Sequence, residues 1–86
     1  MKTYPLIISS PDGDLFNGEA VSISVRGVEG ELAVLADHVP FVTAVKPCEV
    51  VVELENETRK GYTDGGVLTV SKESTTLLSG SFEWHE

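Results

Sequence analysis

Apolar and polar residues alternate along most of this chain with a period of two. The alternation is clearest in three stretches, whose apolar positions are Val21, Ile23 and Val25, then Val50, Val52 and Leu54, then Phe82 and Trp84. Side chains with this spacing point to opposite faces of a β-strand, so one face of each stretch is buried and the other meets water. No window of eleven residues carries the apolar stripe of an amphipathic helix. The pattern therefore predicts an all-β structure.

Further short stretches are rich in β-branched or large apolar residues and predict strands at 4–8, 32–35, 41–45, 67–70 and 75–78. Turn-forming residues separate all of these runs, and Asn17-Gly18 is the strongest hairpin signal because both residues tolerate a positive φ. Pro5 predicts either an edge strand or a nitrogen that points away from the ladder. We expect a single domain over residues 1–86, an antiparallel β-sandwich or flattened barrel of about ten short strands.

Charge and cysteine content narrow the possible functions. Fourteen acidic against six basic residues give a net charge of −8, which argues against nucleic acid and anionic lipid as partners. Cys48 is the only cysteine, so neither an internal disulfide nor a thiolate zinc cluster can form. No apolar run approaches the 18 or so residues that a membrane span requires. We therefore expect no direct insertion into a membrane.

Candidate chemistry is sparse. His38 and His85 lie far apart and show no metal-ligand spacing, and we expect no metal, cofactor or catalytic residue. Glu29, Glu31 and Asp37 cluster in sequence near His38, where an acid–base site is conceivable. Charged residues beside turns are usually solvated, so we favour a surface or interface role for this cluster. Trp84 either closes the core or anchors a partner, and we favour the core.

The run from residue 30 to 47, GELAVLADHVPFVTAVKP, resembles a loop-and-strand unit of the epsilon subunit of F-type ATP synthases. The resemblance extends over about residues 4–78 and includes SPDG at 10–13, LFNGE at 15–19 and GGVLTV at 65–70. Two departures concern turns. Where the family usually has Pro-Gly before the histidine, this chain has Ala36-Asp37, and Asp tolerates a left-handed conformation. Where the family usually has Gly after Pro47, this chain has Cys48, which suits a positive φ poorly.

The resemblance implies the N-terminal β-sandwich domain of epsilon, in a short form without the C-terminal helical hairpin. Such a subunit is not an enzyme. It joins the gamma subunit to the c-ring in the central stalk and helps couple ion translocation to ATP synthesis. Without the hairpin, we expect neither self-inhibition nor nucleotide binding. The implied location is peripheral, at the cytoplasmic face of the inner or plasma membrane, as part of the ATP synthase.

By motif position, the resemblance also implies five interface residues. Glu31 would approach the polar loops of the c-ring, with Asp37 and His38 on the neighbouring loop. His38 and Thr43 would lie toward gamma, as would Ser10 at the end of the first strand.

Two other functions remain open at this point. A free-standing ligand- or peptide-binding β-sandwich would need a concave apolar pocket with a few converging polar groups. A small hydrolase using His38 with nearby carboxylates would need a cleft and a strongly shifted histidine pKa.

Overall fold

The computed structural model describes residues 2–85, and its regular structure there consists of strands only. Ten short strands follow one another along the chain, as the alternation predicted. They are β1 (Tyr4–Ser10), β2 (Gly13–Ala20), β3 (Ser22–Gly27), β4 (Gly30–Leu35), β5 (Phe41–Val45), β6 (Cys48–Glu53), β7 (Thr58–Thr63), β8 (Gly66–Val70), β9 (Thr75–Ser79) and β10 (Phe82–His85).

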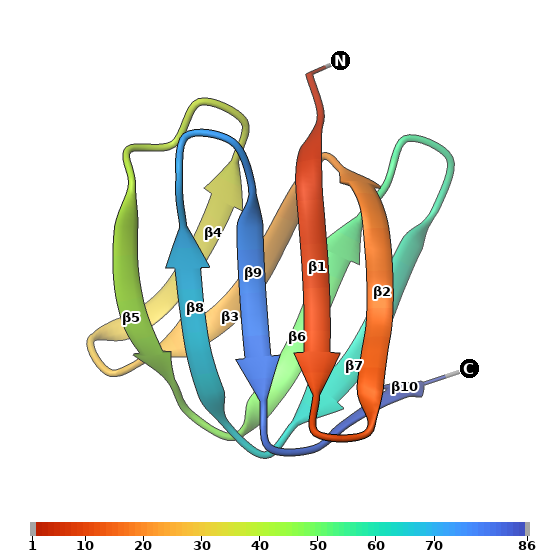
Figure 1. Cartoon of the computed structure of the whole chain (residues 1–86), viewed down its shortest axis with the longest axis vertical. Coiled ribbons are helices and arrows are strands. Elements are labelled where there is room, and N and C mark those ends of the chain that lie inside the picture. The colour runs from red at the N-terminus through yellow and green to blue at the C-terminus, as the bar shows by residue number, and fades with distance from the viewer. Residues whose placement is uncertain (1, 86) are drawn as a thin grey trace.

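The strands form two packed layers (Figure 1). Strands β5, β8, β9, β1 and β2 make a front sheet, and β4, β3, β6, β7 and β10 make a back sheet. The two layers are linked where Gly27 of β3 pairs with Val45 of β5, so the hydrogen-bonded ladder is nearly continuous around the molecule. The predicted sandwich or flattened barrel is confirmed. One pair departs from the prediction, because β1 and β9 run parallel.

The core lies between the two sheets and is made by the inward-facing residues of each strand. Ile23, Val50 and Val52 of the back sheet are fully buried. From the front sheet they meet Leu6, Ile8, Leu68 and Leu77, which are also fully buried. The period-two pattern read from the sequence therefore identifies the buried face correctly.

Trp84 closes the side of the sandwich where β10 and β2 face each other. Its indole Nε1 donates a hydrogen bond of 3.1 Å to the carbonyl of Leu15 in β2. Its ring packs edge-on against Phe82 with centroids 4.9 Å apart, and the Arg59 guanidinium lies 4.0 Å from the centroid of the indole ring. The expectation that Trp84 belongs to the core is confirmed.

The turn predicted at Asn17-Gly18 is wrong, whereas of the two settings predicted for Pro5 only the edge strand is not found. Asn17 and Gly18 lie inside β2, opposite Ile7 and Leu6, and the chain reverses earlier, between Ser10 and Gly13. Pairing along the whole of β1, which buries Leu6, fixes this register and overrides the local preference of Asn-Gly for a turn. Pro5 is not on an edge strand, because β1 lies between β2 and β9. Its missing N–H costs no bond to β9, since that pairing starts at Leu6.

The turn at Cys48 avoids a positive φ, the conformation that cysteine suits poorly. Positive φ values at non-glycine positions within residues 2–85 are confined to Asp37, so Cys48 is not strained there. Cys48 begins β6, and its thiol accepts a hydrogen bond of 3.3 Å from the backbone N–H of Arg26.

Tyr4 ties β1 to the back sheet. Its hydroxyl donates a 2.7 Å hydrogen bond to the carbonyl of Val34 in β4. Burial of the phenol raises the pKa of Tyr4 from the ordinary 10.0 to about 12, and a hydrogen bond from the backbone of Ile23 opposes that rise.

Because the folded state keeps the Tyr4 proton longer than the unfolded state does, this contribution to stability is complete below pH 10 and lost as the pH rises toward 12. The ring is partly exposed to solvent, so we expect a loss of about 1–2 kcal/mol over this window. Urea unfolding at a series of pH values measures it. Tyr4→Phe should remove this part of the pH dependence and Tyr62→Phe, on the outer face of β7, should retain it. If the two variants showed the same pH dependence of unfolding free energy, the pH dependence could not be assigned to Tyr4.

Candidate functional site

Four neighbouring strands of the front sheet contain no Asp, Glu, Lys or Arg. They are β5, β8, β9 and β1, with the sequences FVTAV, GVLTV, TTLLS and YPLIISS. Every strand of the back sheet carries at least one charged residue, and so does β2. Since the chain has twenty charged residues in total, fourteen acidic and six basic, their absence from four adjacent strands defines a distinct surface.

The outward side chains of these strands form rows across the front sheet. One row runs through Ala44, Val67 and Leu78 to Ser9. We call the outward residues of β5, β8 and β9 the neutral face: Val42, Ala44, Val67, Thr69, Thr76 and Leu78. Val42, Val67 and Leu78 are 67%, 40% and 54% exposed. Large apolar side chains that gather on a surface in this way are typical of interaction sites.

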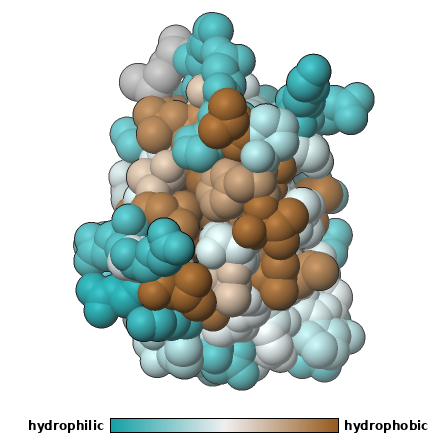
Figure 2. All heavy atoms as spheres, turned by 90° about the vertical axis from the view of Figure 1, so that its left-hand side faces the viewer, coloured by the Kyte–Doolittle hydropathy of each residue, from teal (hydrophilic) through white to brown (hydrophobic). Residues whose placement is uncertain are grey.

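The apolar surface continues around the β5 edge of the sandwich. On this side Leu35, at the end of β4, is 55% exposed and Val39, in the following loop, is 72% exposed. Figure 2 shows apolar side chains gathered on this side of the molecule. The neutral face is therefore part of a larger apolar surface that reaches the loop between β4 and β5.

That loop contains two of the predicted interface residues. Asp37 takes a φ of 67°, which confirms the expectation that it accepts the left-handed conformation. Its carboxylate lies 2.6 Å from the Lys2 ammonium, and this hydrogen bond, with the charge of Asp37, raises the pKa of Lys2. The His38 ring packs on Phe41 with centroids 5.0 Å apart, and its Nδ1 lies 2.9 Å from the carbonyl of Val39.

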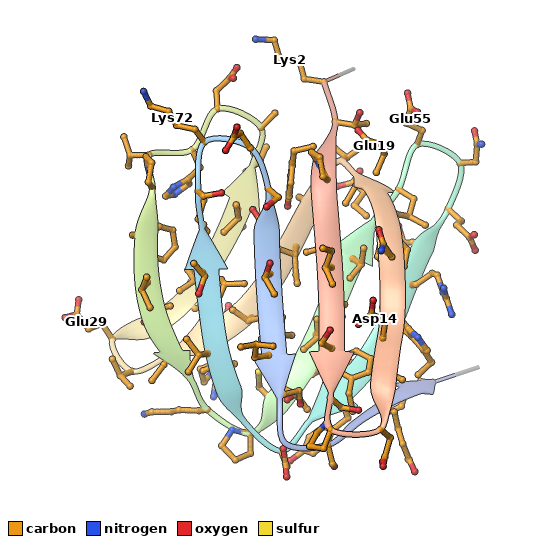
Figure 3. The ribbon with its side chains drawn as sticks, in the orientation of Figure 1. Lys2, Asp14, Glu19, Glu29, Glu55 and Lys72 are labelled. Atoms are coloured by element: carbon orange, nitrogen blue, oxygen red, sulfur yellow. The ribbon has the colours of Figure 1, made fainter. Side chains whose placement is uncertain are left out.

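Glu29 and Glu31 lie at the opposite end of the sandwich. Both belong to the β3–β4 hairpin, where the guanidinium Nη2 of Arg26 lies 3.0 Å from the Glu31 carboxylate. The Glu29 side chain extends from the turn into solvent (Figure 3). The closeness of these two carboxylates to Asp37 and His38 in sequence is not kept in the fold. The six-residue strand β4 stands between them, and at about 3.3 Å per residue it holds Glu31 and Asp37 roughly 20 Å apart.

The remaining two predicted residues lie elsewhere. Ser10 ends β1 at the hairpin turn, where its hydroxyl accepts a hydrogen bond of 3.2 Å from the Asp12 backbone. Thr43 is half-buried, and its neighbours Val42 and Ala44 face outward in its place. The predictions from sequence missed Val42, Val67 and Leu78. The uncharged strands were visible in the sequence, but their adjacency was not.

The back sheet has an open hollow of about 600 Å³ on its outer face, between β3, β4 and β6. Polar and apolar side chains line it together, including Arg26, Glu31, Cys48, Glu49 and Val51. Within residues 2–85, no buried side-chain polar atom lacks a hydrogen-bond partner, and no group of His, Cys, Asp or Glu is arranged to hold a metal ion. The hollow therefore offers little to fix the orientation of a small ligand.

The fold and this surface define a small all-β sandwich domain in which four of the five strands of one sheet carry no charge, whereas every strand of the other sheet is charged. The chain belongs to the family described as ATP synthase, Delta/Epsilon chain, beta-sandwich domain, whose family model matches residues 3–85. The resemblance found in the sequence is thereby confirmed. No helix within the described residues is long and apolar enough to cross a membrane.

Two relatives illustrate the family. The chain is 33% identical over 86 residues to the sodium-ion-specific ATP synthase epsilon chain of Acetobacterium woodii. The aligned region covers 99% of this chain and 65% of that protein. It is 33% identical over 84 residues to the ATP synthase epsilon chain of Wolbachia pipientis wMel, covering 96% of this chain and 74% of that one. The chain thus spans about two thirds to three quarters of these relatives.

Two solved structures share the fold. A chain in the Euglena gracilis mitochondrial ATP synthase, solved as OSCP/F1/c-ring, superposes with a TM-score of 0.89 at 22% identity, covering 95% of this chain and 53% of that one. A chain in the central stalk and c-ring of the Tetrahymena thermophila mitochondrial ATP synthase gives 0.82 at 11% identity, covering 94% and 66%.

Proposed function

We propose that this chain is a non-catalytic rotor subunit of an F-type ATP synthase, joining gamma to the c-ring and helping couple ion translocation to ATP synthesis. The epsilon chains among its relatives and the stalk assemblies that contain the same fold support this function. The subunit acts at the cytoplasmic face of the inner or plasma membrane, held there by its partners.

The neutral face is the observation that carries this proposal. A chain with a net charge of −8 that keeps four adjacent strands free of charge can bury them against a partner without desolvating a charged group. We assign this face to gamma. Ser10 lies at one end of the front sheet, and the loop with Asp37 and His38 lies at the other end (Figure 1). A partner spanning the face would therefore reach both ends, and on β5 it would meet Val42 and Ala44, which face outward on either side of Thr43.

The c-ring contact is assigned to the β3–β4 hairpin through Glu31, which would meet basic residues of the c-ring loops. This hairpin is separated by the length of β4 from the loop that contains His38. The two partners can therefore bind at once. Two sheets packed at interior density deform little under load, which suits a part that transmits torque.

Co-purification tests this function. Tagged protein recovered from its native membranes should bring gamma and the c-ring with it. His38→Ala should lower recovery of gamma and Glu31→Ala should lower recovery of the c-ring, each by up to about fivefold, because exposed polar contacts contribute about 0–1 kcal/mol. Both variants should keep the circular dichroism spectrum of the folded domain. Recovery of neither partner by the unaltered protein would contradict the proposed function, and unfolding of either variant would indicate a structural role for that residue.

A further inference from the structure

The two glutamates of the β3–β4 hairpin are not equivalent. Arg26 and Glu31 are directly opposite in the β3–β4 register, next to the turn, and their side chains form an ion pair of 3.0 Å. Glu29 lies at the tip of the turn and points away from the sheet (Figure 3). The ion pairs among residues 2–85 are Arg26–Glu31 and Lys2–Asp37, so within that range Glu31 has an internal counter-ion and Glu29 has none.

The backbone of Arg26 is held on the side away from Glu31. Its N–H donates to the Cys48 thiol at 3.3 Å, and its carbonyl accepts a 2.9 Å hydrogen bond from the N–H of Lys46. These two hydrogen bonds fix the backbone of Arg26 on β3, so its guanidinium stays within reach of Glu31. Its side chain is 56% exposed and that of Glu31 is 78% exposed, so a partner's cation can reach the same carboxylate.

We propose that Arg26 is an internal competitor for Glu31, which weakens the contact of this hairpin with a basic partner loop and leaves Glu29 as the first carboxylate that the loop meets. This inference rests on the proposed function, because it concerns the contact assigned there to the c-ring. To bind Glu31, a cation of the partner must displace the Arg26 guanidinium and must also come close to the positive charge of Arg26, which repels it. Glu29 imposes no such displacement.

Local charge gives the direction of the effect. The hollow on the back sheet is lined by Arg26, Glu31 and Glu49. Glu29 lies in the turn between β3 and β4. Removing the charge of Arg26 leaves Glu31 without its counter-ion and makes this end of the hairpin more negative, which strengthens both the attraction at contact and the steering of a basic loop toward it. Loss of a charged contact residue would weaken binding, so Arg26→Gln should have the opposite effect to an ordinary interface substitution.

The test is a binding measurement at low ionic strength between the folded chain and the purified complex of gamma with the c-ring. Relative to the unaltered protein, Arg26→Gln should bind about 2–5-fold more tightly and Glu29→Gln about 2–5-fold more weakly. Glu31→Gln should weaken binding by up to about fivefold alone, because it leaves the charge of Arg26 unpaired beside the basic loop, and should also weaken binding when Arg26→Gln is already present. Raising the salt concentration should reduce all of these differences.

Lys60→Gln is the matched control. It removes one positive charge from an exposed position on β7, two strands across the same sheet from Arg26, and should change affinity less than Arg26→Gln does. Equal gains from the two variants would show a general charge effect and overturn the proposal. Unchanged or weaker binding of Arg26→Gln would also overturn it, and weaker binding would indicate that Arg26 itself contacts the partner. If the unaltered chain does not bind the complex, the proposed function fails and this inference fails with it.

Discussion

Leu78→Glu should reduce binding of this chain to gamma by at least about 100-fold. Leu78 is 54% exposed and lies in the row of uncharged side chains between Val67 and Ser9. A carboxylate placed there would be buried by the partner with no cation from the surrounding strands beside it, a cost of several kcal/mol, and 100-fold corresponds to about 2.7 kcal/mol. Because the side chain points to solvent, unfolding of the isolated chain should change by no more than about 0.5 kcal/mol.

Tyr62→Glu provides the control for Leu78→Glu. Tyr62 is 46% exposed on the outer face of the back sheet, between Glu49 and Glu83, so the substitution adds the same charge to the other side of the sandwich. Affinity for gamma should change less than about threefold, measured by surface-immobilised binding or by competition. Similar losses in both variants would mean that net charge, and not the neutral face, controls the association.

Gly66→Ala should cost about 3–5 kcal/mol of unfolding free energy, the largest effect on stability that we expect from a single methyl group in this chain. A Cβ at this position would lie 1.9 Å from the carbonyl oxygen of Leu78 and 3.0 Å from the Cα of Ser79. These are backbone atoms of β9, so no side-chain rotation can relieve the overlap. Relief requires separation of β8 from β9 beneath the neutral face. Urea denaturation followed by circular dichroism measures the loss.

Gly18→Ala is the corresponding control in β2. Its nearest contact would be the Phe16 ring, at 3.4 Å, which is ordinary van der Waals contact with a movable side chain. We expect a change within about 1 kcal/mol, because alanine fits a strand position without strain. Equal costs for Gly18→Ala and Gly66→Ala would show that the close approach of β8 and β9 does not determine stability.

Much of the local structure could be predicted from the sequence because it depends on neighbours along the chain. Alternation identified the buried faces that contain Ile23, Val52 and Phe82, since a strand exposes every second side chain whatever it pairs with. The left-handed backbone of Asp37 followed from the resemblance, which places this residue where the family usually has Gly, together with the tolerance of aspartate for that conformation. The packing of Trp84 against the core followed from its place in the alternating pattern.

The features that could not be predicted from the sequence depend on contacts between residues that are distant along the chain. Asn17-Gly18 has the chemistry of a turn, but pairing with β1 keeps it extended. Glu31 and His38 are close in sequence, yet a strand between them places them at opposite ends of the molecule. The neutral face arises because β5, β8 and β9 are neighbours in the sheet although β5 lies far from the other two along the chain. Neither strand order nor the parallel pairing of β1 with β9 follows from local patterns.

Site-specific photo-crosslinking in native membranes tests most directly whether the neutral face is the docking surface for gamma. A photoreactive side chain at Val42, which is 67% exposed on the neutral face, would be compared with one at Tyr62 on the opposite sheet. We expect a covalent product with gamma from position 42 and none from position 62. A product with gamma from position 62 alone, or with gamma from neither, would contradict this expectation.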